Sequence, residues 1–325
     1  MSQVIRFYEH GGPEVLKLET IDLPPPGPGE VRIHQHAAGL NFIDIYHRNG
    51  LYPVPLPSGL GQEGAGVVEA VGDGVTDFKV GDRVAYAGGP IGGYASDRNY
   101  PVKNLVKLPD GIGFEQAAAM MLQGLTSQYL LRQTYDVKAG DTILLHAAAG
   151  GVGLIATQWA KALGATVIGT VSSQAKADIA SAHGCDHVFI LSEVDLVKEV
   201  KNLTGGQGVP VVYDGIGKDT FMTSLDCLRP RGLMVSFGNA SGAVPAFEPS
   251  LLAAKGSLYL TRPTLAPHIA TRAALDKAAG ELFEVVLSGK VKIEVNQRYP
   301  LADAAQAQID LAARKTTGST VLIPG

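Results

Sequence analysis

The strongest constraint on the fold of this chain is a glycine-rich turn between an apolar strand and a helix. Residues 142–146, Thr-Ile-Leu-Leu-His, read as a buried strand and run directly into Ala147-Ala148-Ala149-Gly150-Gly151-Val152-Gly153, which opens a helix. Gly150 lets the backbone approach a pyrophosphate, Gly153 lets helix and strand pack closely, and the free N–H groups of the helix face the anion. Because Ala148 replaces the first glycine of the usual G-x-G-x-x-G pattern, the motif alone also fits a tight turn without a ligand.

Strands and helices alternate from this turn onward. Apolar strands are expected at 142–146, 165–171, near 188, at 210–214 and at 233–237, with helices between them at 153–163, 175–183, 195–204 and 221–228. This βαβαβ order predicts a doubly wound parallel sheet.

The first 100 residues have a different pattern. Short strands at 31–37, 65–71 and 82–86 are separated by glycine turns, which is typical of a small β-barrel or sandwich. Helices are expected at 114–122 and 126–135. After residue 263, a long helix at 270–288 and two strands form a tail that is too short for its own core, so we expect the tail to rejoin the first domain.

The end of the second strand of the doubly wound sheet indicates which cofactor the chain prefers. An NAD site places Asp or Glu there to accept a hydrogen bond from the ribose 2′-OH. This chain has Ser172 and Ser173, with Lys176 one turn later. Hydroxyl groups and an ammonium attract a 2′-phosphate that a carboxylate would repel. The sequence therefore favours NADPH.

Composition excludes several classes of function. The 325 residues carry a net charge of −4 and no run of five Lys or Arg, so we expect no nucleic-acid partner. No apolar window approaches the ~18 residues of a membrane span, and residues 1–6 do not begin a signal peptide. The two cysteines, Cys185 and Cys227, are too few for a four-thiolate zinc site. We therefore expect a cytoplasmic protein without a membrane partner.

At this point the sequence resembles a known family, the zinc-independent quinone oxidoreductases of the zeta-crystallin type within the medium-chain dehydrogenases/reductases. The resemblance spans essentially the whole chain and is carried by Gly140-Asp141, Leu144, Ala148-Ala149-Gly150-Gly151, Gly153, Gln158, Lys161, Gly66–Gly72, Phe78–Val84 and Gly124–Ser127. It implies a GroES-like, β-rich catalytic domain at 1–122 and 264–325, interrupted by a Rossmann NADPH-binding domain at 123–263. It also implies a homodimer.

The resemblance further implies that no metal is bound. Zinc-dependent relatives have Cys in the segment that matches Gly39–Phe42 and Gly-His-Glu where this chain has Gly61-Gln62-Glu63. Here Asn41 and Gln62 stand at those positions, and the stretch Met121–Gly124, near the third ligand, also lacks Cys. Amides are poor zinc ligands compared with thiolate or imidazole.

The same resemblance implies the site residues. The acceptor site is expected to be lined by Asn41, Tyr46, Tyr52 and Gln62. Cofactor contacts are expected from Asn41, Phe42, Tyr52, Thr126, Ser127, Gly150, Gly151, Val152, Gly153, Ser172, Lys176, Phe237, Gly238, Asn239, Leu260, Thr261, Arg262 and Arg314. One departure is Ile190-Leu191, where relatives often have Asn-Tyr and that Tyr helps to cover the 2′-phosphate ribose.

Three functions are compatible with these features. The first is metal-free hydride transfer from NADPH to a quinone, whose reduced anion is delocalised and can be stabilised by hydrogen-bond donors. The second is reduction of an activated C=C bond in an enal, enone or enoyl thioester. The third is a non-catalytic role, as a crystallin-like protein or a binder of AU-rich RNA, and the acidic charge balance counts against RNA.

Overall fold

The computed structural model describes residues 1–325, and the chain divides into two units. The first unit comprises Met1–Leu125, Ile269–Leu287 and Ile293–Gly325, and the second unit comprises Thr126–His268 and Ser288–Lys292. The sequence places the second domain at 123–263, whereas the second unit runs to His268 and takes in residues 288–292. Gln158 ties that short segment to the second unit: its amide donates to Lys292 O at 3.0 Å and accepts the Lys292 N–H at 2.9 Å.

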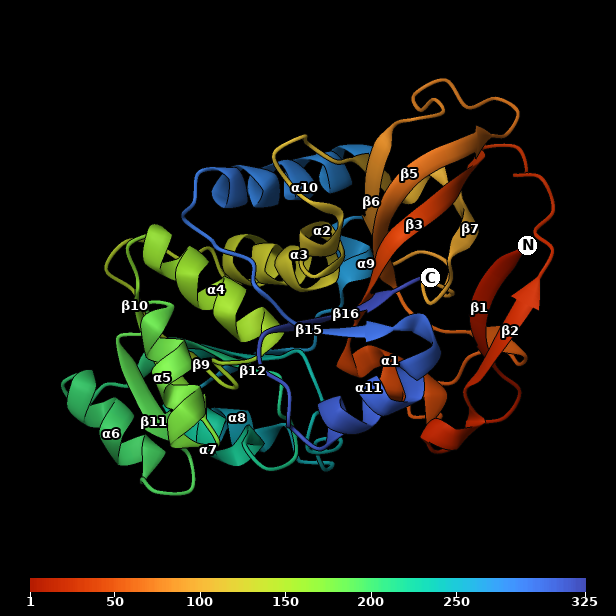
Figure 1. The fold of residues 1–325 in the computed structure, drawn as a ribbon. Coiled ribbons are helices and arrows are strands. Elements are labelled where there is room, and N and C mark those ends of the chain that lie inside the picture. Colours follow the sequence, from red (N-terminus) through yellow and green to blue (C-terminus); the bar gives the residue numbers. More distant parts are fainter. The chain divides into compact units, whose positions relative to one another are not determined.

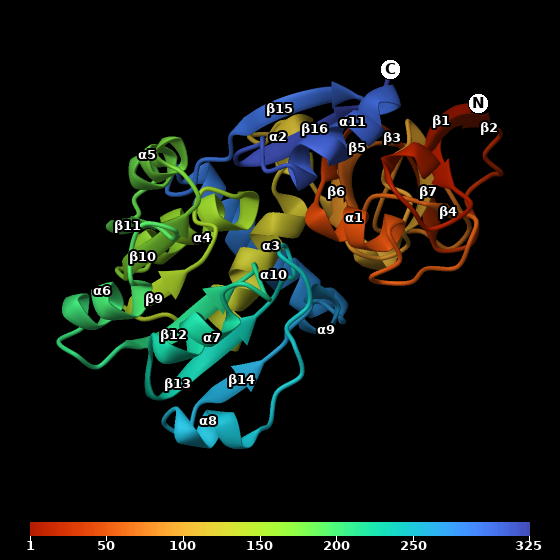
Figure 2. The same cartoon turned by 90° about the horizontal axis from the view of Figure 1, so that it is seen from below.

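The second unit is built on a six-stranded sheet in which every pairing is parallel. Its strands, in spatial order, are β11 (His187–Ile190), β10 (Thr166–Val171), β9 (Thr142–Leu145), β12 (Val209–Asp214), β13 (Leu228–Ser236) and β14 (Tyr259–Thr261). Figure 2 shows them side by side in this order. The strand order reverses between β9 and β12, and ligands bind outside the carboxyl ends of strands at such a switch point.

Helices cover the strands of the second unit. Their bounds are α4 (Gly151–Ala162), α5 (Gln174–Ala182), α6 (Leu196–Leu203), α7 (Phe221–Asp226), α8 (Ser250–Ala254) and α9 (Leu265–His268). Figure 1 shows α4 to α7 in green beside the strands. Apolar residues of α6, α7 and four strands form one buried cluster, which includes Val200, Phe221, Leu144 and Met234. The doubly wound α/β domain predicted from the sequence is confirmed.

The first unit contains two sheets. A three-stranded sheet has the order β2 (Lys17–Ile21), β1 (Ser2–Phe7) and β4 (Ser58–Gly59). A seven-stranded sheet has the order β15 (Val295–Pro300), β16 (Ser319–Ile323), β3 (Glu30–Leu40), β5 (Glu63–Val71), β6 (Arg83–Ala87) and β8 (Leu105–Lys107), with β7 (Asp97–Pro101) also paired to β3. The C-terminal strand β16 pairs with β3 in antiparallel register, so the tail rejoins the first unit as expected.

The helices of the first unit are fewer. They are α1 (Phe42–Arg48), α2 (Phe114–Ala118), α10 (Arg272–Leu287) and α11 (Ala304–Ala312). Helix α3 (Met121–Tyr129) begins in the first unit, continues into the second and ends in a π-helical turn at Leu130–Thr134. The sequence pattern predicted neither α1 nor α11. It predicted helices at 114–122 and 126–135, whereas the structure breaks after α2 and continues α3 through residues 123–125.

The break between α2 and α3 is explained by a contact with a distant segment. Helix α3 begins at Met121, and the N–H groups of its first turn have no partner within the helix. The Glu63 carboxyl group accepts one of them, the Leu122 N–H, at 2.6 Å. A buried acidic side chain on strand β5 therefore starts a new helix where the apolar pattern predicts one continuous helix. No helix of the chain is both long and apolar enough to cross a membrane; the expected cytoplasmic location stays a prediction.

Candidate functional site

The glycine-rich turn of the second unit has the geometry of an anion-binding turn. Strand β9 ends at Leu145, Ala147 adopts a positive φ of 54°, and Gly150 N–H donates to Ala147 O at 2.9 Å. Helix α4 follows with Gly150 as its N-cap, and no side chain caps it. The N–H groups of the first helical turn are therefore not satisfied by a side-chain cap, which is the arrangement of an anion-binding helix start.

Gly153 is required by the packing of this turn. A Cβ atom at this residue would lie 2.2 Å from Ala147 O and 2.7 Å from the carbonyl carbon of Ala148. Both neighbours are backbone atoms, which cannot turn aside as a side chain would. The close approach of α4 to the turn thus depends on a glycine here.

The residues predicted to recognise a 2′-phosphate follow the adjacent strand. Strand β10 ends at Val171, Ser172 and Ser173 are exposed, and α5 begins at Gln174 with Lys176 in its first turn. Because β9 and β10 are parallel neighbours, the two loops leave the same edge of the sheet. The loop that carries Ser172 and Ser173 and the start of α5 with Lys176 thus lie at the same sheet edge as the glycine-rich turn.

The departure at Ile190-Leu191 lies on the next strand. Ile190 pairs with Val171, and Leu191 N–H donates to Val171 O at 3.0 Å. Leu191 packs against the buried cluster of the second unit. These two residues offer apolar surface where relatives often place an aromatic hydroxyl.

Other predicted cofactor residues of the second unit also lie near this edge. Phe237, Gly238 and Asn239 follow strand β13, and Leu260, Thr261 and Arg262 form the end of β14 and its exit. Ser127 is buried on α3, with its hydroxyl 3.5 Å from Val152 O in the first turn of α4; Thr126 precedes it. The structure therefore gathers these residues on one unit.

In the first unit, a chain of buried polar side chains passes through Asn41. The Ser319 hydroxyl donates to Gln123 Oε1 at 2.7 Å, and Gln123 Nε2 donates to Asn41 Oδ1 at 3.2 Å. Asn41 Nδ2 donates to Glu63 Oε1 at 2.5 Å, and Glu63 Oε2 accepts the Leu122 N–H. Each member fixes the orientation of the next, so the Asn41 amide is held in one orientation.

Two buried carboxyl groups, Glu63 and Asp44, hydrogen-bond to Asn41, and the sequence pattern did not single them out. Burial raises the pKa of Glu63 to about 8, although hydrogen bonds from Leu122 and Asn41 oppose the shift. Burial likewise raises the pKa of Asp44 to about 7, against hydrogen bonds from Asn41 N–H and the Tyr94 hydroxyl. The only available signal was an acidic residue inside an apolar segment, as in Leu40-Asn41-Phe42-Ile43-Asp44.

The donor set around Asn41 does not fit a zinc ion. The Asn41 and Gln123 oxygens both already accept hydrogen bonds, and an amide is a weak zinc ligand beside thiolate or imidazole. Hydrogen bonds therefore join Gln123, Asn41 and Glu63, in the region where the resemblance places the metal ligands of zinc-dependent relatives.

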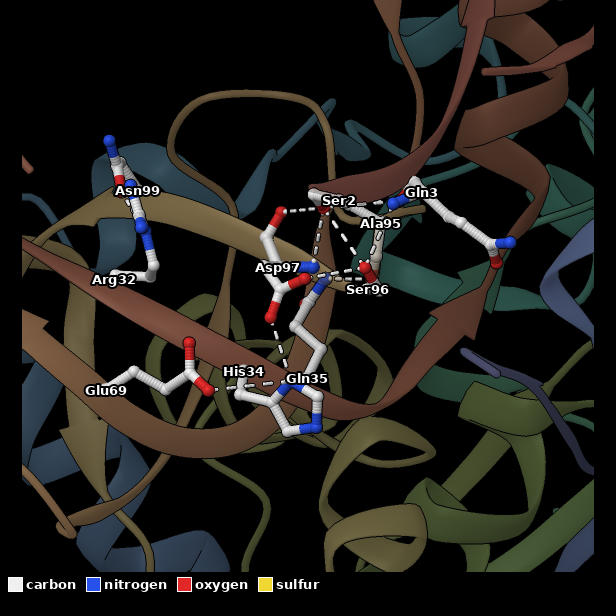
Figure 3. A network of polar contacts seen from close by, with 10 residues as sticks. All are labelled: Ser2, Gln3, Arg32, His34, Gln35, Glu69, Ala95, Ser96, Asp97 and Asn99. Carbon is white, nitrogen blue, oxygen red and sulfur yellow. Dashed lines mark hydrogen bonds and ion pairs between the residues drawn. The ribbon is translucent and has the colours of Figure 1, made fainter. Parts of the chain in front are cut away.

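Three potential metal ligands meet elsewhere on the first unit, on strands β3, β5 and β7 (Figure 3). His34 Nδ1 lies 2.8 Å from Asp97 Oδ1 and 3.9 Å from Glu69 Oε1. The Ser96 hydroxyl donates to Asp97 Oδ2 at 2.7 Å. His34 and Glu69 are roughly half exposed. The hydrogen bonds of Asp97 with His34 and Ser96 account for the arrangement without a metal ion.

The predicted aromatic residues of the first unit lie together. The rings of Tyr46 and Tyr52 meet edge to face with centroids 5.2 Å apart, and Phe42 lies 6.3 Å from Tyr46. Tyr46 is almost fully buried on α1, the helix that Asn41 caps. Gln62, next to Glu63, is half-buried. The aromatic contacts thus run from Phe42 in the first turn of α1 through Tyr46 to Tyr52 beyond the end of the helix, and Asn41 is the N-cap of the same helix.

Arg314 has a different setting. It is exposed, has a positive φ of 59° and follows α11 in the first unit. Its contact with the cofactor stays a prediction.

A parallel α/β sheet with a glycine-rich turn at its switch point, joined to a β-rich unit that carries an amide-centred site, defines a dinucleotide-binding dehydrogenase or reductase of the medium-chain class. Two family models match the chain, the alcohol dehydrogenase GroES-like domain over residues 27–110 and the zinc-binding dehydrogenase over residues 151–272. The zinc-binding dehydrogenase model covers only residues 151–272, so its match does not include Asn41, Gln62 or Gln123 in the first unit.

Similar proteins identify the family within this class. A quinone oxidoreductase of Pseudomonas aeruginosa is 58% identical over 325 residues, with 100% of both chains covered. The crystal structure of Escherichia coli quinone oxidoreductase complexed with NADPH is 52% identical, with a TM-score of 0.98 over 99% of this chain and 100% of that chain. A 2-haloacrylate reductase of Burkholderia sp is 46% identical over 326 residues, with 98% of each chain covered. The chain belongs to the quinone oxidoreductase family of the medium-chain dehydrogenases/reductases.

Proposed function

We propose that this protein is an NADPH-dependent quinone oxidoreductase that reduces quinones by hydride transfer without a metal ion. The observation that carries the proposal is the cofactor edge of the second unit, where an uncapped helix N-terminus adjoins Ser172, Ser173 and Lys176. The 52% identical E. coli protein, whose structure is complexed with NADPH, supports the same cofactor.

The residues of the second unit have distinct tasks in this proposal. The N–H groups at the start of α4 bind the pyrophosphate, because they have no partner in the helix and the helix dipole favours an anion. Ser172 and Lys176 bind the 2′-phosphate through hydrogen bonds and charge. The bound NADPH supplies the hydride.

In the first unit, we assign the acceptor to Asn41, Tyr46, Tyr52 and Gln62. Tyr46 and Tyr52 offer ring faces to a planar quinone, and their hydroxyl groups polarise its carbonyl oxygens. The hydrogen-bond chain holds the Asn41 amide, so it meets developing negative charge without reorganisation. The quinone oxygens can take protons from water, so no residue is assigned as an obligatory acid.

Cofactor preference tests the proposal directly. One charge-assisted hydrogen bond contributes about 1.5–3 kcal/mol, so the wild-type enzyme should prefer NADPH over NADH by at least about tenfold in kcat/KM. Lys176→Ala should remove most of that preference and leave NADH kinetics nearly unchanged. Lys198→Ala, which removes an exposed charge of the same sign from α6, is the matched control and should preserve the preference. Equal use of NADH by the wild-type enzyme would contradict the assignment of Ser172 and Lys176.

A second candidate reaction has its own support. The 2-haloacrylate reductase is 46% identical across 98% of this chain, and its name denotes reduction of an activated alkene. A screen of NADPH oxidation with 1,4-benzoquinones, enones, enals and 2-haloacrylates separates the two. A kcat/KM for an alkene that exceeds every quinone value would replace the first function by the second.

We also propose that the protein works as a homodimer. Strand β14 is the edge of the six-stranded sheet, so one side of its backbone is unpaired in the single chain, and Tyr259 on it is more than half exposed. A second copy paired along this strand would cover both features. Light scattering after size-exclusion chromatography measures the mass, and a monomer at micromolar concentration would contradict the proposal.

A further inference from the structure

A buried hydrogen-bond chain lies under the cofactor edge of the second unit. His146 Nδ1 lies 2.8 Å from the Thr170 hydroxyl, and His146 Nε2 lies 2.9 Å from the Ser224 hydroxyl. Asp214 Oδ2 accepts from Ser224 Oγ at 2.8 Å and from Thr220 Oγ1 at 2.7 Å. All five side chains are at most 1% exposed. The contacts are shielded from bulk solvent, so the polar groups satisfy one another.

The contacts fix the direction of every hydrogen bond in the chain. The Asp214 carboxylate meets four donors, the two hydroxyls and the N–H groups of Ile216 and Gly217, so it only accepts. Ser224 has a single proton, which it donates to Asp214, so toward His146 it accepts. His146 therefore carries its proton on Nε2, and its unprotonated Nδ1 accepts from Thr170. Burial lowers the pKa of His146, which keeps the ring neutral.

The chain connects the ends of three neighbouring strands. His146 directly follows β9 and leads into the glycine-rich turn, and Thr170 lies one residue before the end of β10, whose exit carries Ser172. Asp214 ends β12 and holds the following loop through the N–H groups of Ile216 and Gly217.

The loop after β12 in turn holds the loop after β13. Ser241 N–H donates to Ile216 O at 2.8 Å, and Ala240 N–H donates to Gly215 O at 3.2 Å. The second of these loops begins with Phe237–Asn239, which are expected cofactor contacts. The hydrogen-bonded side chains and these backbone contacts therefore connect the loops after β9, β10 and β13, where cofactor contacts are expected.

We propose that His146 is a positioning residue for the dinucleotide: through Thr170, Ser224 and Asp214 it holds the cofactor loops in one arrangement, so that NADPH binds a preformed site. The inference rests on the proposed function, because it assigns these loops to NADPH. The effect acts on cofactor affinity, since none of the four side chains is exposed enough to touch the ligand.

Thr170→Val tests the inference with little change of shape. The variant removes the donor to His146 Nδ1 and leaves that buried nitrogen without a partner. Kd for NADPH, measured by nicotinamide fluorescence, should rise about 5- to 30-fold, which corresponds to a hydrogen bond of about 1–2 kcal/mol. Thr157→Val is the matched control, because the Thr157 hydroxyl is equally buried in α4 and has no hydrogen-bond partner. Its Kd should stay within about twofold of wild type.

Kinetics separate positioning from general stability. At saturating NADPH, Thr170→Val should keep kcat and the quinone KM within about threefold of wild type, while KM for NADPH rises with Kd. His146→Gln, which retains one donor and one acceptor, should bind NADPH more tightly than His146→Leu. Ser224→Ala combined with Thr170→Val should cost less than the product of the single effects, since one lost partner already frees the ring.

The outcomes distinguish the two proposals. A wild-type enzyme that does not bind NADPH refutes the proposed function. A wild-type enzyme that binds NADPH, with Thr170→Val of lower melting temperature but unchanged Kd, refutes the positioning role. If the variants do not fold, ¹⁵N NMR of the wild-type imidazole decides: protonated Nε2 with unprotonated Nδ1 supports the chain, and the opposite tautomer overturns it.

Discussion

Substitution of Gly153 by alanine should separate the helix start from the cofactor turn. The added Cβ would lie 2.2 Å from Ala147 O, whereas ordinary van der Waals contact requires about 3.5 Å. Because Ala147 and Ala148 meet the new atom with their backbone, rotation of a side chain cannot relieve the clash. The start of α4 must therefore move away from the turn by about 1 Å.

The magnitude follows from two opposing terms. Overpacking of this kind costs about 1–3 kcal/mol, while alanine gains about 1 kcal/mol over glycine in helix propensity. We expect Gly153→Ala to lower the free energy of unfolding by up to about 2 kcal/mol. A 1 Å displacement also takes N–H groups out of the 2.7–3.2 Å range of a hydrogen bond to the pyrophosphate. Loss of one such bond to a charged group should weaken NADPH binding about 10- to 100-fold.

Urea denaturation measures the stability, and fluorescence titration measures the affinity. The control is Gly280→Ala on α10, where a Cβ would meet nothing within 4 Å and the residue is exposed. That variant should gain about 0.5–1 kcal/mol and bind NADPH as wild type does. If Gly153→Ala matches wild type in both measurements, the packing argument for the turn is wrong. If it loses stability but keeps its affinity, the turn does not bind the pyrophosphate.

Three further predictions concern the first unit. The pKa of Glu63 is raised from 4.5 to about 8, so the folded protein keeps a proton that the unfolded chain releases. The free energy of unfolding should therefore fall as pH rises between about 5 and 8, by on the order of a few kcal/mol. Glu63→Gln should flatten this pH dependence in urea titrations, and an unchanged slope would refute the raised pKa of Glu63. Tyr46→Phe and Tyr52→Phe should each lower kcat/KM for 1,4-benzoquinone about 10- to 100-fold; a fall beyond ~10⁴-fold at one of them would reveal a general acid, and no effect would place the acceptor elsewhere. Amides stand where zinc-dependent relatives carry metal ligands, so the purified enzyme should contain no stoichiometric zinc and keep its activity in chelator. Elemental analysis and assays in chelator measure the two properties. One zinc per chain, with activity lost in chelator, would contradict the prediction.

Sequence patterns were sufficient for the first five strands of the second unit because their signals are local, whereas the edge strand β14 and the short helices α8 and α9 were not predicted. The alternation of apolar strands with helices and the turn before α4 are each complete within a few tens of residues. A parallel order then follows from chain connectivity, and it brings the ends of β9 and β10 to one edge. The amino-acid sequence alone therefore places Ser172 and Lys176 beside the turn.

Other features depend on contacts between residues far apart in the sequence, and only the tertiary structure shows them. The chain through Asn41 joins residues 41, 63, 123 and 319, and no spacing rule relates positions so far apart. Glu63 divides α2 from α3 because it accepts a helix N–H from another element, which overrides the apolar pattern of 114–122. Likewise, His146 reads as the last residue of a strand, and only folding around the sheet surrounds it with Thr170 and Ser224. A buried polar group must find a partner wherever the fold supplies one, so these contacts follow from the packing of distant segments.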